Sequence, residues 1–499
     1  FYSFDYKKYN ENRGIFKRVT INEIHDVKNI DSVYFKFLTL RNKLSLKINR
    51  ELTFDKSGYF QALIFGDKGY LLKDDINSFK NLGTSHLLAI SGLHIGVLIS
   101  LIYFILLKFR VSVEYIEKII LTIVPLYMLL SGASASVLRA GFMIIFYILL
   151  RRKNIDKLGS LFLTFLILIM YNPLFIFNIG FQLSFLITFC LLMSESYIKK
   201  AKNKFHGALR ISLISTLASM PILMYNFYNI VYISVFSNII LVPIFSVVIF
   251  PLVIFSYILF LINIQLFNTI CRPILNITFN IFDKIQDLFL IAQPIRIGKL
   301  NIFFIIVIFI FVLTILINLN KFKYMSAIYG VFGIILVCLG ATYTPKAYIE
   351  DVNIGKESIL YIRENKKNML INTFNNIQNF YTDYRKKDKD YDIINQYDLL
   401  LNYEGKNKFD YLLLTSAKKN KSEYSLDLIA NDLVGKVIVI ESLEKKLQEV
   451  RNMAQYKKID YIVLKENTEM KFGKSSIYYY NKKVRVKNKN SEFEVEVDN

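Results

Sequence analysis

Long apolar runs restrict the possible folds of this chain more than any other feature. Between residues 87 and 344 they recur with only short polar or basic linkers between them. A soluble core needs no runs of this length, whereas a helix that crosses a hydrocarbon layer needs about 20 apolar residues. Since 54% of the 499 residues are hydrophobic, we predict a polytopic α-helical membrane protein. Helices are predicted at residues 87–107, 116–131, 135–150, 158–172, 181–198, 209–227, 236–263, 302–320 and 325–344.

Basic residues indicate how these helices are oriented. The formal net charge is +22, and Lys and Arg gather in four of the linkers. Cytoplasmic loops of membrane proteins carry this excess, so we place these four loops inside, and the charge alone is weak evidence for a nucleic-acid partner. They contain Lys108, Arg110 and Lys118; Arg151, Arg152, Lys153 and Lys157; Lys199, Lys200, Lys202, Lys204 and Arg210; and Lys321 and Lys323.

The run at 236–263 decides on which side the rest of the chain lies. A single crossing puts Lys321 outside, against the charge rule, whereas a re-entrant pair that dips in and returns puts it inside. Asn238, Pro243 and Pro251 supply breaks for such a pair. We therefore predict a re-entrant region, an amphipathic surface helix over 264–300, and N-terminal and C-terminal soluble regions that are both extracytoplasmic.

The remaining segments are more polar. Residues 1–30 include an alternating stretch that reads as a strand, and 31–82 have apolar residues at helical spacing, which predicts amphipathic interfacial helices. Residues 345–499 are rich in charge and are predicted to form a soluble α/β domain. Its strands are expected at 358–363, 409–415, 436–440, 460–464 and 476–480, with a helical stretch near 441–456.

Polar groups enter the apolar region at Gly83–Gly96, whose sequence is GTSHLLAISGLHIG. A hydrocarbon core offers no partner for the imidazoles of His86 and His94 or for the hydroxyl of Ser91. These groups, with the break at Gly92, predict the wall of a water-filled cavity. The alternative is that His86 is interfacial and that Ser91 and Gly92 only allow close helix packing.

The stretch HLLAISGLHIG resembles the signature of the ComEC family of competence membrane proteins. This resemblance implies a transmembrane competence domain at 83–344, an OB-fold of which 1–30 would be a remnant, and a metallo-β-lactamase-like domain at 345–499. It also implies a channel that carries single-stranded transforming DNA across the bacterial inner membrane. Because the chain opens at Phe1 without Met, and the family's earlier helices and strands are missing, we expect an incomplete chain.

Three further stretches resemble family motifs. Ser136 and Arg139 lie in SGASASVLRAGFM, Gln182 and Ser184 in GFQLS, and Asn238 with Pro243 in SNIILVP. The resemblance makes these residues candidates for the wall of a DNA conduit. Two alternatives stay open: Arg139 snorkels to the interface, and the other polar residues bind neighbouring helices.

The sequence contains no phosphate-binding loop of the Walker type, so energy for transport must come from a partner. The resemblance implies a cytoplasmic helicase-like ATPase and a surface DNA receptor, besides single-stranded DNA and membrane lipids, and leaves a homo-oligomer open. No cofactor is expected. Cys190, Cys271 and Cys338 lie in or beside apolar segments without a CxxC spacing, and we interpret them as small hydrophobic residues.

The C-terminal domain departs from the family pattern. Phe409–Thr415 resembles the strand that precedes the metal-binding HxHxDH motif, but the motif positions are Ser416, Lys418, Asn420 and Lys421. No His follows His206, so an imidazole-rich zinc site cannot form. We predict a domain without nuclease activity. The alternatives to a channel are a non-conducting remnant that acts as a scaffold, and a membrane-tethered metal-dependent nuclease.

Overall fold

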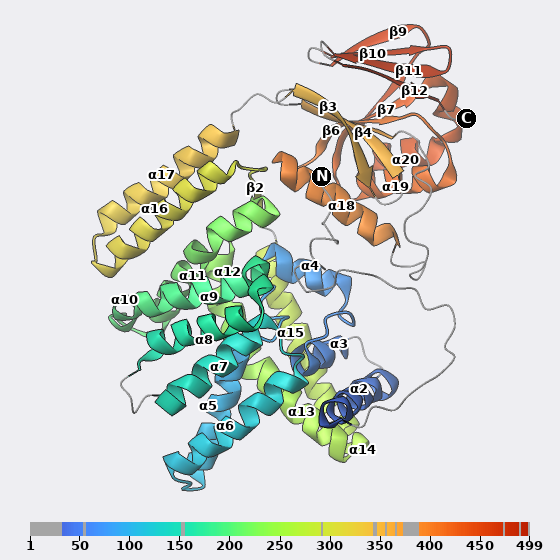
Figure 1. Ribbon diagram of the computed structural model, residues 1–499. Helices are drawn as coiled ribbons and strands as arrows, with labels where there is room; N and C mark the ends of the chain where they lie inside the picture. The colour runs from blue at the N-terminus through green and yellow to red at the C-terminus, as the bar shows by residue number, and fades with distance from the viewer. Residues whose placement is uncertain are drawn as a thin grey trace.

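The computed structural model describes residues 32–497 except for 53–55, 151–154, 291–292, 343–346, 355–356, 365–366, 373–388, 473–474 and 489–490. The predicted OB-fold remnant at 1–30 lies outside the described residues. Figure 1 shows a helical part and a smaller C-terminal part that contains two sheets. The helical part begins with α2 (Val33–Glu51), α3 (Gly58–Phe60) and α4 (Lys73–Asn81).

Apolar helices follow where the sequence predicts them. The first of them begins at Gly92 rather than at residue 87, because residues 82–91 form turns that end in the extended backbone of Ser91 (φ −119°, ψ 171°). The series comprises α5 (Gly92–Lys108), α6 (Val113–Leu130), α7 (Ala135–Leu150), α8 (Lys157–Tyr171), α9 (Ile179–Met193), α10 (Glu195–Lys199), α11 (Lys204–Phe227), α12 (Ser234–Pro243), α13 (Phe250–Ile262), α14 (Ile264–Leu266), α15 (Arg272–Leu290), α16 (Ile302–Asn320) and α17 (Tyr324–Thr342).

Three helical segments among the described residues are long and apolar enough to cross a membrane: Lys204–Phe227, Ser234–Ile262 and Ile302–Asn320. Several shorter helices are also apolar, among them α5, α7, α8 and α9. Large apolar side chains are exposed on many of them, such as Phe104 and Phe162. Water would make such a surface costly and lipid does not, so the chain is a membrane protein.

The prediction of a re-entrant pair at 236–263 is wrong. The segment Ser234–Ile262 is one continuous helix of 29 residues, which is roughly 43 Å long at 1.5 Å per residue. A π-helical turn at Ile244–Ile249 follows Pro243 directly, and Pro251 stands at the start of α13. Proline has no backbone N–H to donate within a helix. A π-turn holds one residue more than an α-helical turn and accommodates this loss, so the helix continues past Pro243.

A helix forms within the predicted range 264–300, and its place on a membrane surface stays a prediction. From Ile264 to Leu290 the chain is helical, through a π-turn at Phe267–Cys271, and it returns along α12 and α13. Strand β1 (Asn229–Ile230) precedes the outgoing helix, and it pairs antiparallel with β2 (Ile295–Arg296), which follows the returning one. The start and the end of this helical hairpin therefore lie together at one end of the bundle.

The two faces of the returning helix explain its position. Phe279 and Phe282 are fully buried in the same core cluster as Phe245 and Phe250 of the outgoing helix. The surface outside this core is mixed. It exposes apolar side chains at helical spacing, namely Leu266, Ile270, Ile274, Ile277 and Ile281, and polar side chains, namely Asn276, Asn280, Lys284 and Asp287.

The C-terminal part is an α/β unit. A six-stranded sheet has the order β3-β4-β5-β6-β7-β8, antiparallel from β3 to β5 and parallel from β5 to β8. Its elements are β3 (Ala347–Ile354), β4 (Glu357–Glu364), β5 (Lys367–Asn372), α18 (Lys389–Glu404), β6 (Phe409–Leu414), α19 (Lys419–Ala430), β7 (Val434–Ile440), α20 (Gln448–Tyr456) and β8 (Asp460–Leu464). The antiparallel sheet of β9 (Thr468–Phe472), β10 (Ser475–Tyr480), β11 (Lys483–Asn488) and β12 (Ser491–Glu496) follows. The predicted strands are confirmed, and the likeness to a metallo-β-lactamase stays a prediction.

The two parts touch where β2 leaves the helical bundle. Arg296 donates to Asp398 (2.6 Å) and to the carbonyl of Lys406 (3.0 Å), and the N–H of Lys299 donates to the carbonyl of Tyr403 (2.7 Å). Gly298 and Gly405 both have positive φ, and their backbones lie in contact. The C-terminal part is thus fixed to the end of the bundle that holds β1 and β2.

Candidate functional site

Residues 82–96 form the segment on which the motif residues converge, and we call it the signature segment. Gly83 has φ +70°, and a Cβ at this position would lie 2.7 Å from Cβ of Ser234. Ser237, in the motif that contains Asn238, donates its hydroxyl to the carbonyl of Leu82 at 3.0 Å. The start of α12 is therefore bound directly to the turn at the beginning of the signature segment.

His94 is enclosed rather than open to a passage. Its side chain has no exposed surface, and its ring centroid lies 4.6 Å from that of Phe250 and 6.0 Å from that of Phe245. The N–H of Ser91 donates to Nδ1 of His94 at 3.1 Å, which places the proton of a neutral ring on Nε2. Among the described residues this Nε2 has no hydrogen-bond partner.

Arg139 is the charged member of the site. Only 8% of its surface is exposed, so the snorkelling alternative does not describe its position. Its Nε donates to Oγ of Ser184 at 2.6 Å, which joins α7 to α9. Gly92 at the start of α5 lies against Nη2, and any Cβ at this position would overlap that atom. Three of the predicted motifs therefore meet at the guanidinium of Arg139.

The other predicted residues are spread around this centre. His86 is exposed in a turn of the signature segment, and Ser136 is partly exposed one turn before Arg139 on α7. Gln182 points away from Arg139, since its amide donates to the carbonyl of Ile176. Asn238 lies on α12 with a buried Oδ1 that has no described partner, and Pro243 is exposed. Neither Gln182 nor Pro243 belongs to the cluster at Arg139.

Comparison with known proteins covers the part of the chain that contains these motifs. A family model described as competence protein matches residues 63–322, which is just over half of the chain and includes the whole site. This chain belongs to the competence protein family. ComE operon protein 3 of Bacillus subtilis (strain 168) is 34% identical over 235 residues, which cover 47% of this chain and 30% of that relative. No solved structure matches.

One polar cluster of this competence-family chain could not be found from its motifs. Nζ of Lys56 lies 2.9 Å from Asp75 and 2.9 Å from Asp283, so it joins the α2–α3 turn to α4 and α15. Burial alone would lower the pKa of Lys56, but its hydrogen bonds to the two carboxylates outweigh this effect and raise the pKa. The three residues lie far apart in sequence and follow no spacing pattern.

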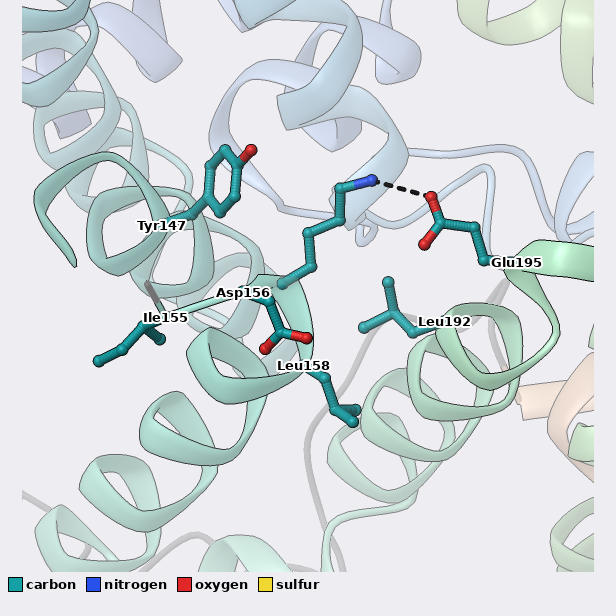
Figure 2. Close-up of a pocket in the computed structure, with 7 residues that line it drawn as sticks. Tyr147, Ile155, Asp156, Leu158, Leu192 and Glu195 are labelled. Carbon is teal, nitrogen blue, oxygen red and sulfur yellow. Dashed lines mark hydrogen bonds and ion pairs between the residues drawn. The ribbon is translucent and has the colours of Figure 1, made fainter. Parts of the chain in front are cut away.

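A pocket of about 470 Å³ lies away from the competence-family motifs. Figure 2 shows it between the ends of α7, α8 and α9, with the ion pair between Lys157 and Glu195 (3.2 Å) at its edge. Asp156 caps α8 by accepting from the N–H of Gly159. The pocket borders basic loops that the sequence places inside, and none of the predicted conduit residues lines it.

The positions that replace the family's metal ligands follow β6 in the C-terminal part. Ser416 is buried and Lys418 is exposed, and the Ser416 hydroxyl accepts from the N–H of Lys418 at 3.2 Å. A hydroxyl and an ammonium group are poor zinc ligands compared with imidazole, thiolate or carboxylate. Within the described part of the chain no three His, Cys, Asp or Glu side chains are grouped to hold a metal ion.

Proposed function

We propose that this chain is the membrane core of a channel through which single-stranded DNA crosses the bacterial inner membrane during natural competence. Membership of the competence protein family and the membrane-type helices support this proposal. The observation that carries it is Arg139, a buried guanidinium at the meeting point of three motifs that forms none of the described ion pairs. A DNA strand supplies the negative charge that such a group needs.

Loop charges and the β1–β2 pairing support a topology for the channel. With the basic loops inside, α5, α7 and α9 each begin at the outer side, so Gly92, Arg139 and Ser184 lie near the outer ends of their helices. Since β1 and β2 share one side, Ser234–Ile262 crosses inward and the helix ending at Leu290 crosses back. Helix α16 then leads inward, which keeps Lys321 inside and leaves the C-terminal part outside.

This topology assigns places to the partners. A helicase-like ATPase would pull the strand from the basic, inner side, and a surface receptor would deliver DNA to the outer side. The C-terminal part, a degenerate metallo-β-lactamase-like domain in this proposal, serves as a docked scaffold rather than a nuclease. Lipids contact the exposed isoleucines of α15 in this proposal.

DNA uptake in the host of this chain tests the proposal. The gene is deleted and then restored as wild type or as Arg139→Ala, and labelled DNA that becomes resistant to external nuclease is counted. We expect uptake to require the wild-type gene and to fall strongly in the variant, with equal amounts of both proteins in the membrane fraction. Uptake that continues without the gene would contradict the proposal and favour a non-conducting remnant.

A further inference from the structure

The hydrogen bonding of Arg139 is incomplete for a buried guanidinium. A guanidinium has five N–H donors. Among the described residues, Arg139 uses Nε toward Ser184 (2.6 Å) and Nη1 toward the weak acceptor Sδ of Met143 (3.9 Å). Burying a charge without full pairing is unfavourable. Nη2 thus has no described acceptor, and the strongest acceptor for a guanidinium is an anion.

Other shielded cations of this chain show what Arg139 lacks. Lys56 lies between two carboxylates, Arg363 pairs with Glu404, and Arg296 pairs with Asp398. Arg41, which has no carboxylate partner among the described ion pairs, donates to the backbone carbonyls of Leu130 (2.8 Å) and Phe65 (2.7 Å). Arg139 has neither a carboxylate nor a carbonyl partner among the described hydrogen bonds and ion pairs.

The surroundings of Arg139 have the polarity that an anion requires. Gly92 gives the guanidinium access to the start of α5, a helix of 17 residues. The first N–H groups of a helix have no partner within it and carry the positive end of its dipole. Ser184 accepts from Arg139, which leaves its own O–H able to donate. Donors of α7 and α9 thus lie beside the start of α5, whose third N–H is already capped by Ser91.

We infer that Arg139, Ser184 and the N-terminus of α5 form a phosphate-binding site. In the proposed topology this site lies near the outer ends of the helices, where it would receive a phosphodiester of the entering strand. The choice of DNA as the source rests on the proposed function. A phospholipid headgroup carries the same phosphate chemistry, so the experiment must distinguish the two sources.

The test uses the full chain in nanodiscs of zwitterionic phospholipid. Binding of a fluorescent single-stranded oligonucleotide is measured against salt, beside the same sequence with uncharged methylphosphonate linkages. Three variants are compared with wild type: Arg139→Gln, Gly92→Ala and Arg139→Lys. Arg210→Gln is the matched control, because Arg210 already donates to the carbonyl of Tyr197 and lies 4.2 Å above its ring. Native mass spectrometry of each protein reports phospholipid that remains bound.

We expect wild type to prefer the charged oligonucleotide. Arg139→Gln should weaken binding about tenfold or more and reduce the slope of log affinity against log salt by about 0.7, the value for one phosphate contact on a single strand. Gly92→Ala should weaken binding by displacing the guanidinium, Arg139→Lys should retain the salt slope with lower affinity, and Arg210→Gln should bind as wild type does.

The remaining outcomes separate the site from the function. If wild type binds no DNA but retains anionic phospholipid that Arg139→Gln loses, the phosphate site stands and its proposed occupant is a lipid. If wild type binds DNA and Arg139→Gln binds it equally, with equal lipid content, the inference is overturned while the proposed function stands. Should Arg139→Gln fail to fold, as judged by circular dichroism, Arg139→Lys and Gly92→Ala still decide the matter.

Discussion

Replacing Lys56 by methionine should loosen the contact between α4 and α15. Nζ of Lys56 lies 2.9 Å from one oxygen of Asp75 and 2.9 Å from one oxygen of Asp283. The second oxygen of each carboxylate is buried without a described partner. Methionine keeps most of the side-chain volume but removes the only described cation that pairs with these two like charges.

The magnitude follows from the exposure of the three side chains. Breaking a buried ion pair by removing one partner costs about 3–5 kcal/mol. The side chains of Lys56 and Asp75 are 14% and 13% exposed, but that of Asp283 is 33% exposed, so water screens part of the remaining repulsion. We take the lower end, about 3 kcal/mol, which corresponds to roughly a hundredfold change in a local opening constant.

Hydrogen exchange measured by mass spectrometry on the protein in nanodiscs reports this opening directly. Peptides from α4 and from the C-terminal half of α15 should exchange roughly a hundredfold faster in Lys56→Met. The double variant Lys56→Met with Asp283→Asn should recover part of the loss, since one of the two repelling charges is gone.

The control is Lys436→Met, because the pair of Lys436 with Asp460 is exposed on both sides and contributes at most about 1 kcal/mol. If Lys56→Met changes exchange in α4 and α15 no more than this control does, the reasoning that Lys56 holds the two helices together is refuted.

Two further predictions concern the C-terminal part. Gly405→Ala should weaken the attachment of the C-terminal part to the bundle by about 1–2 kcal/mol, since φ is +66° and the added Cβ would lie 3.0 Å from the amide nitrogen of Gly298. Limited proteolysis should then cleave between the two parts sooner. Gly340→Ala is the control and should not change the rate, because its added Cβ meets nothing within 4 Å. The hydrogen bond from Tyr480 and the contact with Arg485 lower the pKa of Glu494 to about 2, below its value of 4.5 in the unfolded chain. Its contribution to stability is therefore complete above about pH 4.5 and is lost as the pH falls through about 2. Exchange protection of β11 and β12, corrected for the intrinsic rate, should decline over this interval in wild type but not in Glu494→Gln; an equal decline in both would contradict the assignment.

Apolar periodicity was sufficient to predict nearly every helix of the membrane part. Helix α7, for example, begins and ends where the sequence predicts. The start of α5 was misjudged because residues 87–90 are as apolar as the helix itself, and only the extended backbone at Ser91 separates them from it. High hydropathy indicates that a segment is buried in protein or in contact with lipid. A buried turn has high hydropathy just as a buried helix does, so hydropathy alone does not separate them.

The motif residues could be predicted because they are polar residues in apolar segments. Their hydrogen-bond partners could not be predicted. Ser184 receives the Nε donor of a residue on another helix, and Ser237 donates to Leu82, which lies 155 positions earlier. Such pairs depend on how the helices pack, and sequence spacing carries no information about it. The same holds for His94, whose polarity suggested an aqueous surface although two phenylalanine rings lie against it.

The packing of the segment 264–290 has an electrostatic part that the sequence does not predict. Arg272, Asp283, Lys284 and Asp287 lower the mean hydropathy of this segment, so it was interpreted as a surface helix. In the structure, however, Lys56 neutralises Asp283 from another part of the chain, while Phe279 and Phe282 pack against the preceding helix. The charge of Asp283 is thus compensated by a residue that the sequence gives no reason to place beside it.

The charge rule requires an even number of crossings between the end of α11 and the start of α16. In the proposed topology Ser234–Ile262 and the helix ending at Leu290 meet this requirement in place of one re-entrant segment, and the β1–β2 pairing supports that arrangement. In the proposed topology the returning helix brings Asp283 into the bilayer, where an unpaired carboxylate is costly. The ion pair of Lys56 with Asp283 thus supports the proposed topology as well as the local packing.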